Sequence, residues 1–110
     1  MESFIRENTW LTSRACGWGN GYVLIPTTSK LHGVNYNLLN DLEQIFVHGG
    51  LTFSELVDVE MCESWGLKDD SIGMWCVGFD TAHYGDDKTR WTEERVQKEA
   101  DNLLSQLQSI

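Results

Sequence analysis

The segment 92–107 constrains the fold most, because its apolar residues recur at helical spacing while its other faces are polar. Thr92 can cap the first turn, and Glu93 and Glu94 suit the positive end of the helix dipole. The apolar side chains that share one face are Val96, Ala100, Leu103, Leu104 and Leu107. A helix with a single apolar face needs a partner surface, so we expect it to pack across a sheet.

Three apolar runs bounded by turn residues predict the strands of that sheet. They are residues 22–25, closed by Pro26, residues 44–47, ended by a glycine turn, and residues 74–79, which are apolar enough to be buried on both faces. Residues 51–53 can leave the glycine turn as a further strand. The predicted fold class is therefore α+β, a small and mainly antiparallel sheet with the C-terminal amphipathic helix on one face.

Other segments carry weaker patterns. Residues 35–42 suit a short helix or an extended arm, and residues 55–73 suit a loop or an edge strand around Leu56, Val57 and Val59. The first fifteen residues allow a short strand or a helical turn. At 110 residues, 1–110 is expected to form a single α+β domain around one core.

The charge balance excludes some partners. Seventeen acidic and eight basic residues give a net charge of −9, and no basic stripe could neutralise phosphates, so direct nucleic-acid binding is not expected. An acidic mimic of nucleic acid stays open as an alternative. No run approaches a membrane span and no signal-peptide layout is present, which predicts a cytoplasmic protein without membrane contact. The aromatic content allows a homodimer through an exposed apolar patch.

The first candidate site is the run 47–53, in which His48 precedes Gly49 and Gly50, with Thr52 close behind. Paired glycines let a ligand approach the backbone, and their N–H groups can form an anion-binding nest. The alternative is a plain glycine turn whose histidine bonds to nearby backbone.

The second candidate site is the run 78–86, where Asp80, His83 and Asp86 are spaced three apart. Aspartate and histidine together serve as metal ligands, or as a general base with the group that orients it. With His48 added, the predicted metal ligands are His48, Asp80 and His83, holding a divalent ion. A structural role, with Asp80 capping a turn and His83 bonded to it, is the alternative.

Other reactive residues rank lower. His32 lies in a loop and could join the same cleft, while Trp18, Trp65 and Trp91 could form pocket walls. The three cysteines, Cys16, Cys62 and Cys76, are widely spaced and predict buried thiols rather than a disulfide framework or a zinc knuckle.

Four motifs in order resemble a family of small uncharacterised proteins encoded by tailed phages and prophages. They are residues 21–26, Leu31-His-Gly33 with Tyr36, residues 47–53 and residues 75–86. Family members often carry a His-Pro pair before the Leu-His-Gly element, where this chain has Ser29-Lys30. The resemblance carries no activity; it implies a non-structural accessory protein in the cytoplasm of an infected bacterial host.

Two main functional hypotheses follow from these residues. In the first, a phage accessory protein, with counter-defence as one candidate role, binds a nucleotide-like small molecule or a host protein through the two candidate runs. In the second, the histidines and aspartates hold a metal ion that activates water for hydrolysis. We favour the binding protein from sequence, because no motif assigns a nucleophile, a base and an electrophile together.

Overall fold

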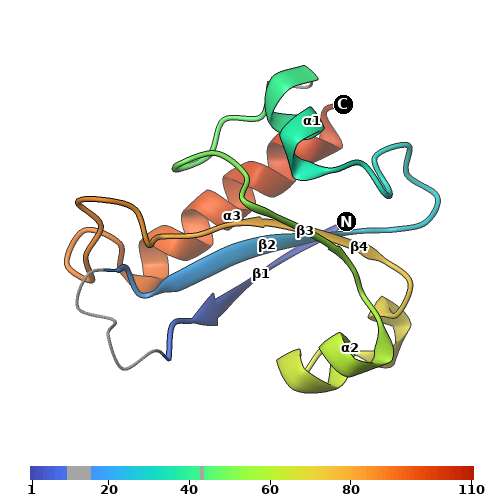
Figure 1. Cartoon of the computed structure of the whole chain (residues 1–110), viewed down its shortest axis with the longest axis horizontal. Coiled ribbons are helices and arrows are strands. Elements are labelled where there is room, and N and C mark those ends of the chain that lie inside the picture. The colour runs from blue at the N-terminus through green and yellow to red at the C-terminus, as the bar shows by residue number, and fades with distance from the viewer. Residues whose placement is uncertain (10–15, 43) are drawn as a thin grey trace.

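The computed structural model describes residues 1–9, 16–42 and 44–110, and it is built on a four-stranded antiparallel sheet (Figure 1). The strand order is β1-β2-β4-β3. Helices α3 and α1 lie on one side of the sheet and α2 lies on the other (Figure 1). The elements in chain order are β1 (Glu2–Glu7), β2 (Gly19–Ile25), α1 (Tyr36–Leu42), β3 (Phe53–Leu56), α2 (Val59–Trp65), the 3-10 turn η2 (Asp69–Ser71), β4 (Trp75–Phe79) and α3 (Glu93–Gln108). The predicted α+β class is confirmed.

The two central strands, β2 and β4, are the predicted apolar runs. They pair antiparallel, with Val23 opposite Val77 and Gly21 opposite Phe79. Both valines are fully buried, in the same cluster as the apolar face of α3. A side chain at Gly21 would begin 2.5 Å from the ring of Phe79 and 3.0 Å from Ala100, so glycine lets α3 approach the sheet closely.

Helix α3 begins where the sequence predicts. The Thr92 hydroxyl accepts a hydrogen bond of 3.3 Å from the Arg95 N–H, as an N-cap should. The buried residues of the helix are Val96, Ala100, Leu103 and Leu107. Leu104 lies at the margin of this face and is only partly buried. The predicted apolar face is therefore confirmed, with Leu104 at its edge.

The opposite face of the sheet carries a second cluster of buried residues, and α2 covers part of it. Phe4, Tyr22, Phe53 and Trp65 meet there, with ring centroids 4.9 to 6.2 Å apart. Such aromatic pairs add to the stabilisation from burial alone.

Helix α2 corrects the prediction for residues 55–73. Of the residues expected in an edge strand, only Leu56 lies in β3; Val57 follows the strand and Val59 begins a helix. The Asp58 carboxylate accepts from the Met61 N–H at 2.8 Å, and Gly66, with φ 65°, ends the helix in a left-handed C-cap. These cap signals are local, and they outweigh the mixed apolar and acidic pattern that indicated a loop.

The predicted strand at residues 44–47 is wrong. This segment runs as irregular chain beside α3, because side chains of the helix satisfy its backbone. The Phe46 N–H donates to Gln106 Oε1 and the Phe46 carbonyl accepts from Gln106 Nε2, both at 2.8 Å. The strand expected at 51–53 begins only at Phe53 and continues to Leu56.

The open alternatives for two other segments are now decided. Residues 35–42 form a helix, α1, rather than an arm. The start of the chain forms the edge strand β1, while residues 10–15 lie outside the described part of the chain. Among the described residues, none of the helices has the length and apolar character needed to span a bilayer.

Candidate functional site

His48 is held by contacts to α3 and to the segment before it. The turn is closed by the Gly50 N–H, which donates to the Val47 carbonyl at 2.9 Å, so this N–H does not face a ligand as the predicted nest requires. Glu99 Oε2 accepts from the His48 N–H at 2.9 Å and ties the turn to α3. The imidazole lies over the indole of Trp91, with ring centroids 4.2 Å apart. Glu99 thus holds the backbone of His48, and its ring packs on Trp91 while remaining partly exposed.

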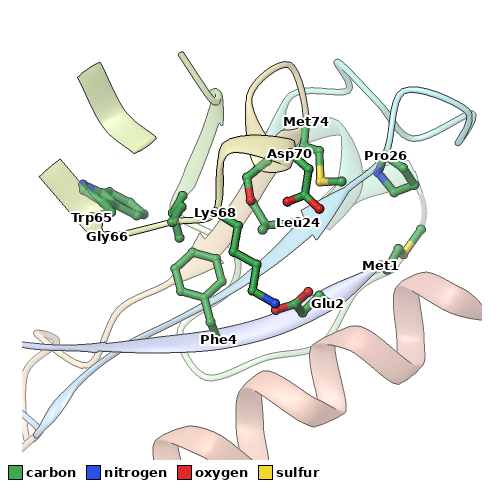
Figure 2. A pocket seen from close by; sticks show the side chains of 12 residues that line it. Met1, Glu2, Phe4, Leu24, Pro26, Trp65, Gly66, Lys68, Asp70 and Met74 are labelled. Atoms are coloured by element: carbon green, nitrogen blue, oxygen red, sulfur yellow. The ribbon is translucent and has the colours of Figure 1, made fainter. Parts of the chain in front are cut away.

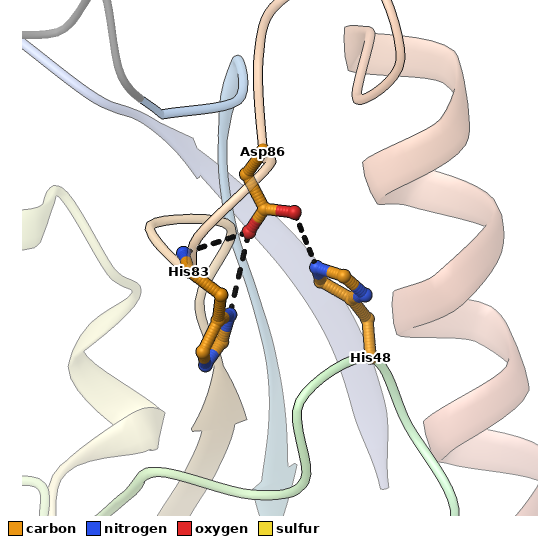
Figure 3. A group of neighbouring side chains, drawn as sticks. All are labelled: His48, His83 and Asp86. Atoms are coloured by element: carbon orange, nitrogen blue, oxygen red, sulfur yellow. Dashed lines mark hydrogen bonds and ion pairs between the residues drawn. The ribbon is translucent and has the colours of Figure 1, made fainter.

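Asp80, His83 and Asp86 lie on the loop that follows β4. Asp80 Oδ1 accepts from the Ala82 N–H at 3.0 Å, and Asp86 Oδ2 accepts from the His83 N–H at 2.8 Å. These short-range bonds fold the loop back on itself. The side chains of His83 and Asp86 then lie close to His48 (Figure 3). Asp86 is only 7% exposed, which is unusual for an aspartate.

The two candidate runs meet in space (Figure 3). His48 Nε2 lies 2.8 Å from Asp86 Oδ1, and His83 Nδ1 lies 3.3 Å from Asp86 Oδ2. The two imidazole rings are 5.3 Å apart and nearly perpendicular, at 89°. One donor atom from each of the three side chains lies within 4.8 Å of the other two. We call His48, His83 and Asp86 the His-Asp-His cluster.

The hydrogen bonding in this cluster is uneven. Asp86 accepts from the His48 ring and from the His83 backbone, so both of its oxygens are used. His83 Nδ1 lies 3.3 Å from Asp86 and 3.4 Å from Asp80 Oδ1, yet it is buried and makes no hydrogen bond. Buried polar atoms ordinarily have a partner, and a cation bound between this ring nitrogen and the two carboxylates would provide one.

The charge state of Asp86 favours a cation. Burial alone would raise the pKa of this carboxyl, but the hydrogen bond from His48 and the backbone hydrogen bond from His83 outweigh it and lower the pKa below its usual value. Asp86 is therefore ionised at neutral pH, with its negative charge directed at two imidazoles.

Asp80, Thr52 and Gly49 surround the His-Asp-His cluster. Thr52 Oγ1 donates to Asp80 Oδ2 at 3.0 Å and fixes that carboxylate. A Cβ at Gly49 would lie 2.3 Å from the His83 ring, so only glycine lets the turn pass this close. Thr52 and Asp80, from the two candidate runs, thus lie beside the cluster, and Gly49 packs directly against it.

His32 lies elsewhere. Its Nε2–H donates to the Gly73 carbonyl at 2.8 Å, and its ring lies near Trp75, at the start of β4, whereas His83 follows the end of that strand. The idea that it joins the cleft is wrong, because its loop packs at the opposite end of the sheet.

Two residues of the site carry no motif of their own. Glu99 anchors the His48 turn, and Arg95 lies over the Trp91 ring with its guanidinium carbon 4.2 Å from the centroid. Both project from the polar side of α3, where charged residues ordinarily indicate only a solvated surface. The composition of the helix gives no signal that separates them.

The cysteines lie outside the site. All three are buried, as predicted. Cys76 is on β4 in the middle of the sheet, and burial raises the pKa of its thiol to about 12. A thiol with this pKa is protonated at neutral pH and is a poor nucleophile.

Besides a smaller hollow of about 220 Å³ that is lined in part by Thr52 and Asp80, two larger hollows flank these elements. One, of about 380 Å³, lies beside the cluster and is lined by His48, Trp91, Arg95, Lys98 and Glu99. The other, of about 410 Å³, lies between β1 and the α2–η2 segment and is lined in part by Phe4, Trp65 and Lys68 (Figure 2). Trp91 and Trp65 therefore line pockets, as expected, while Trp18 packs against the core.

The fold and the site define an α+β protein with helices on both sides of its sheet (Figure 1) and a His-Asp-His cluster with a buried carboxylate at one end of that sheet. Comparison with protein-family models, with curated proteins and with solved structures finds no match. The phage source and the counter-defence role that the motif resemblance implies therefore stay predictions.

Proposed function

We propose that the protein binds a divalent transition-metal ion, of which Zn²⁺ is representative, through His48, His83 and Asp86. The observation that carries the proposal is the convergence of three donor atoms within 4.8 Å of one another from segments 38 positions apart in the chain. Two imidazoles and one carboxylate are a donor set that Zn²⁺, Co²⁺ and similar ions favour.

The spacing of the donor atoms supports this proposal. Ligands at about 2.0–2.1 Å from a tetrahedral ion lie about 3.3–3.4 Å from one another. His83 Nδ1 is 3.3 Å from Asp86 Oδ2, and His48 Nε2 is 2.8 Å from the other oxygen, Asp86 Oδ1, so the carboxylate would bind an ion through both oxygens or turn to present one of them. An ion therefore requires a small outward movement of His48 and the loss of its Nε2 proton. Its side chain is 26% exposed, which leaves room for that movement.

Asp80 supports the same centre from the other side. Its Oδ1 lies 3.4 Å from His83 Nδ1, and Thr52 fixes its second oxygen. Asp80 thus adds negative charge beside the ion and can supply a further oxygen ligand, in line with its place in the predicted ligand set.

Three protein ligands leave one position of a tetrahedral ion for water or for a bound molecule, which is the arrangement of catalytic rather than structural zinc sites. An ion at this position would lower the pKa of a bound water and polarise a bound oxyanion. We therefore place the protein among metal-dependent binding proteins or hydrolases, and the cluster is where its ligand reacts or is held.

The competing explanation is structural, in which Asp86 serves only to tie the two loops together. A calorimetric titration of the metal-free protein with Zn²⁺ separates metal binding from this purely structural role. We expect one ion per chain, with binding lost or weakened at least about a hundredfold in His48→Ala and His83→Ala, since each removes one of three ligands.

His32→Ala is the matched control, because it removes an imidazole outside the cluster and should bind Zn²⁺ like the unmodified protein. With Co²⁺ in place of Zn²⁺, intense visible absorption bands would report tetrahedral coordination. The proposal fails if the unmodified protein binds no ion, or if His83→Ala and His32→Ala bind it equally well.

A further inference from the structure

We infer that the protein holds a phosphoryl oxyanion, such as the phosphate group of a small organic phosphate, in the hollow beside the metal centre, and that Arg95 and Lys98 bind its charge there. This inference rests on the proposed metal site and names the class of molecule that the site takes. The hollow of about 380 Å³ is large enough for a phosphate with a small organic group attached.

His48 is the wall that the hollow and the metal centre share. Its ring lies against Trp91 with centroids 4.2 Å apart, and the Arg95 guanidinium lies against the same indole at 4.2 Å. Lys98 follows Arg95 by three positions, so both project from neighbouring turns of α3. An anion bound in this hollow would lie beside His48, which is also a proposed metal ligand. Two cationic side chains of the helix, Arg95 and Lys98, would line the same hollow.

The charge distribution singles out this region. The protein carries a net charge of −9 and eight basic residues, of which four fall in one short stretch. They are Lys88, Arg90, Arg95 and Lys98. Of these four, Arg95 and Lys98 line the hollow, so a small anion, which the acidic surface as a whole repels, meets two cations there next to a divalent ion.

The two cations keep most of their binding capacity. Lys98 contacts only the exposed Glu94, at 3.5 Å, and both side chains are about four-fifths exposed, so the pair is weak and readily exchanged. Arg95 uses Nη1 to bond the Arg90 carbonyl at 2.9 Å, which positions a planar group that has five N–H donors.

Glu99 is the acidic member of the lining. Its two oxygens accept hydrogen bonds from the His48 N–H at 2.9 Å and from Asn102 Nδ2 at 3.0 Å. These bonds direct the carboxylate toward the turn and the helix and partly offset its charge. The remaining charged groups that line the hollow, Arg95 and Lys98, are positive.

Phenylphosphonate is a suitable probe, because it presents a phosphoryl oxyanion and is not hydrolysed. We expect it to bind the Zn²⁺-loaded protein, with affinity that falls as salt is raised. The double variant Arg95→Gln/Lys98→Gln should bind the probe at least about tenfold more weakly while its Zn²⁺ affinity changes less than about threefold. Lys30→Gln, an exposed cation outside the hollow, should leave both affinities unchanged.

The outcomes separate the two proposals. If the Zn²⁺ titration shows no binding before probe is added, the metal site fails and the inference fails with it. If Zn²⁺ binds but phenylphosphonate does not, or binds the double variant as tightly, the inference is overturned and the metal site stands. Benzoate tests the anion class: affinity equal to that of phenylphosphonate would overturn the assignment to phosphoryl groups.

Discussion

Asp86 accepts a hydrogen bond of 2.8 Å from the imidazole of His48, a residue 38 positions earlier in the chain. This contact joins the loop after β4 to the turn beside α3, and the same carboxylate caps its own loop through the His83 N–H. One buried side chain therefore supports both halves of the candidate site, which makes its charge the natural point at which to test it.

Asp86 should give the protein part of its resistance to acid. Its pKa is lowered in the folded state, so its contribution to stability is full above the usual aspartate pKa of about 3.8 and is lost as the pH falls through the lower folded value. We expect Asp86→Asn to lower the free energy of unfolding at pH 7 by about 1–3 kcal/mol and to flatten its decline below pH 4. Urea unfolding between pH 2 and 7 measures this, with the exposed Asp41→Asn as control. Parallel pH profiles for Asp86→Asn and the unmodified protein would show that this carboxylate has no special role.

Gly49→Ala should disturb the site more than the same change in another left-handed glycine. Gly49 and Gly33 have φ values of 69° and 82°, so alanine strains the backbone at both, by about 1 kcal/mol. A Cβ at Gly49 would also lie 2.3 Å from the His83 ring, whereas nothing lies within 4 Å at Gly33. We expect Gly49→Ala alone to move the His83 ring resonances and to weaken Zn²⁺ binding. Equal effects of the two variants on these signals would contradict the close packing of the turn on His83.

Leu103→Ala tests the packing of α3 on the sheet. The side chain is fully buried in the cluster with Phe79, and its loss should cost about 2–5 kcal/mol of unfolding free energy. Glu94→Ala, on the exposed side of the same helix, should change stability by less than about 0.5 kcal/mol. Thermal unfolding followed by circular dichroism compares them. An unchanged midpoint for Leu103→Ala would mean that the assigned face of the helix is wrong.

Cys76 should resist alkylation in the folded protein. Its side chain is fully buried and its thiol pKa is raised to about 12, so very little thiolate exists at pH 8 and reagent cannot reach it. Peptide mapping after brief iodoacetamide treatment should find Cys76 unmodified in buffer and fully modified in denaturant. Rapid modification without denaturant would place this residue outside the central strand.

Several features could be read from the chain because their signals lie within a few residues of one another. The Thr92 cap and the apolar period of α3, and the compact apolar runs of β2 and β4, specify structure locally. The cap residues Asp58 and Gly66 of α2 are equally local signals, but the prediction for this segment rests only on the mixture of apolar and acidic residues, which is typical of loops.

The sequence by itself determined which residues could do chemistry, because histidines and aspartates beside glycines at the ends of apolar runs are visible without coordinates. Only the tertiary structure decided how they meet. The contact between His48 and Asp86 requires α3 to hold the turn through Glu99, and the polar side of α3 also keeps residues 44–47 out of the sheet through Gln106. These bonds join residues 38 to 60 positions apart, and no local periodicity encodes them, because their geometry exists only once the helix has packed on the sheet.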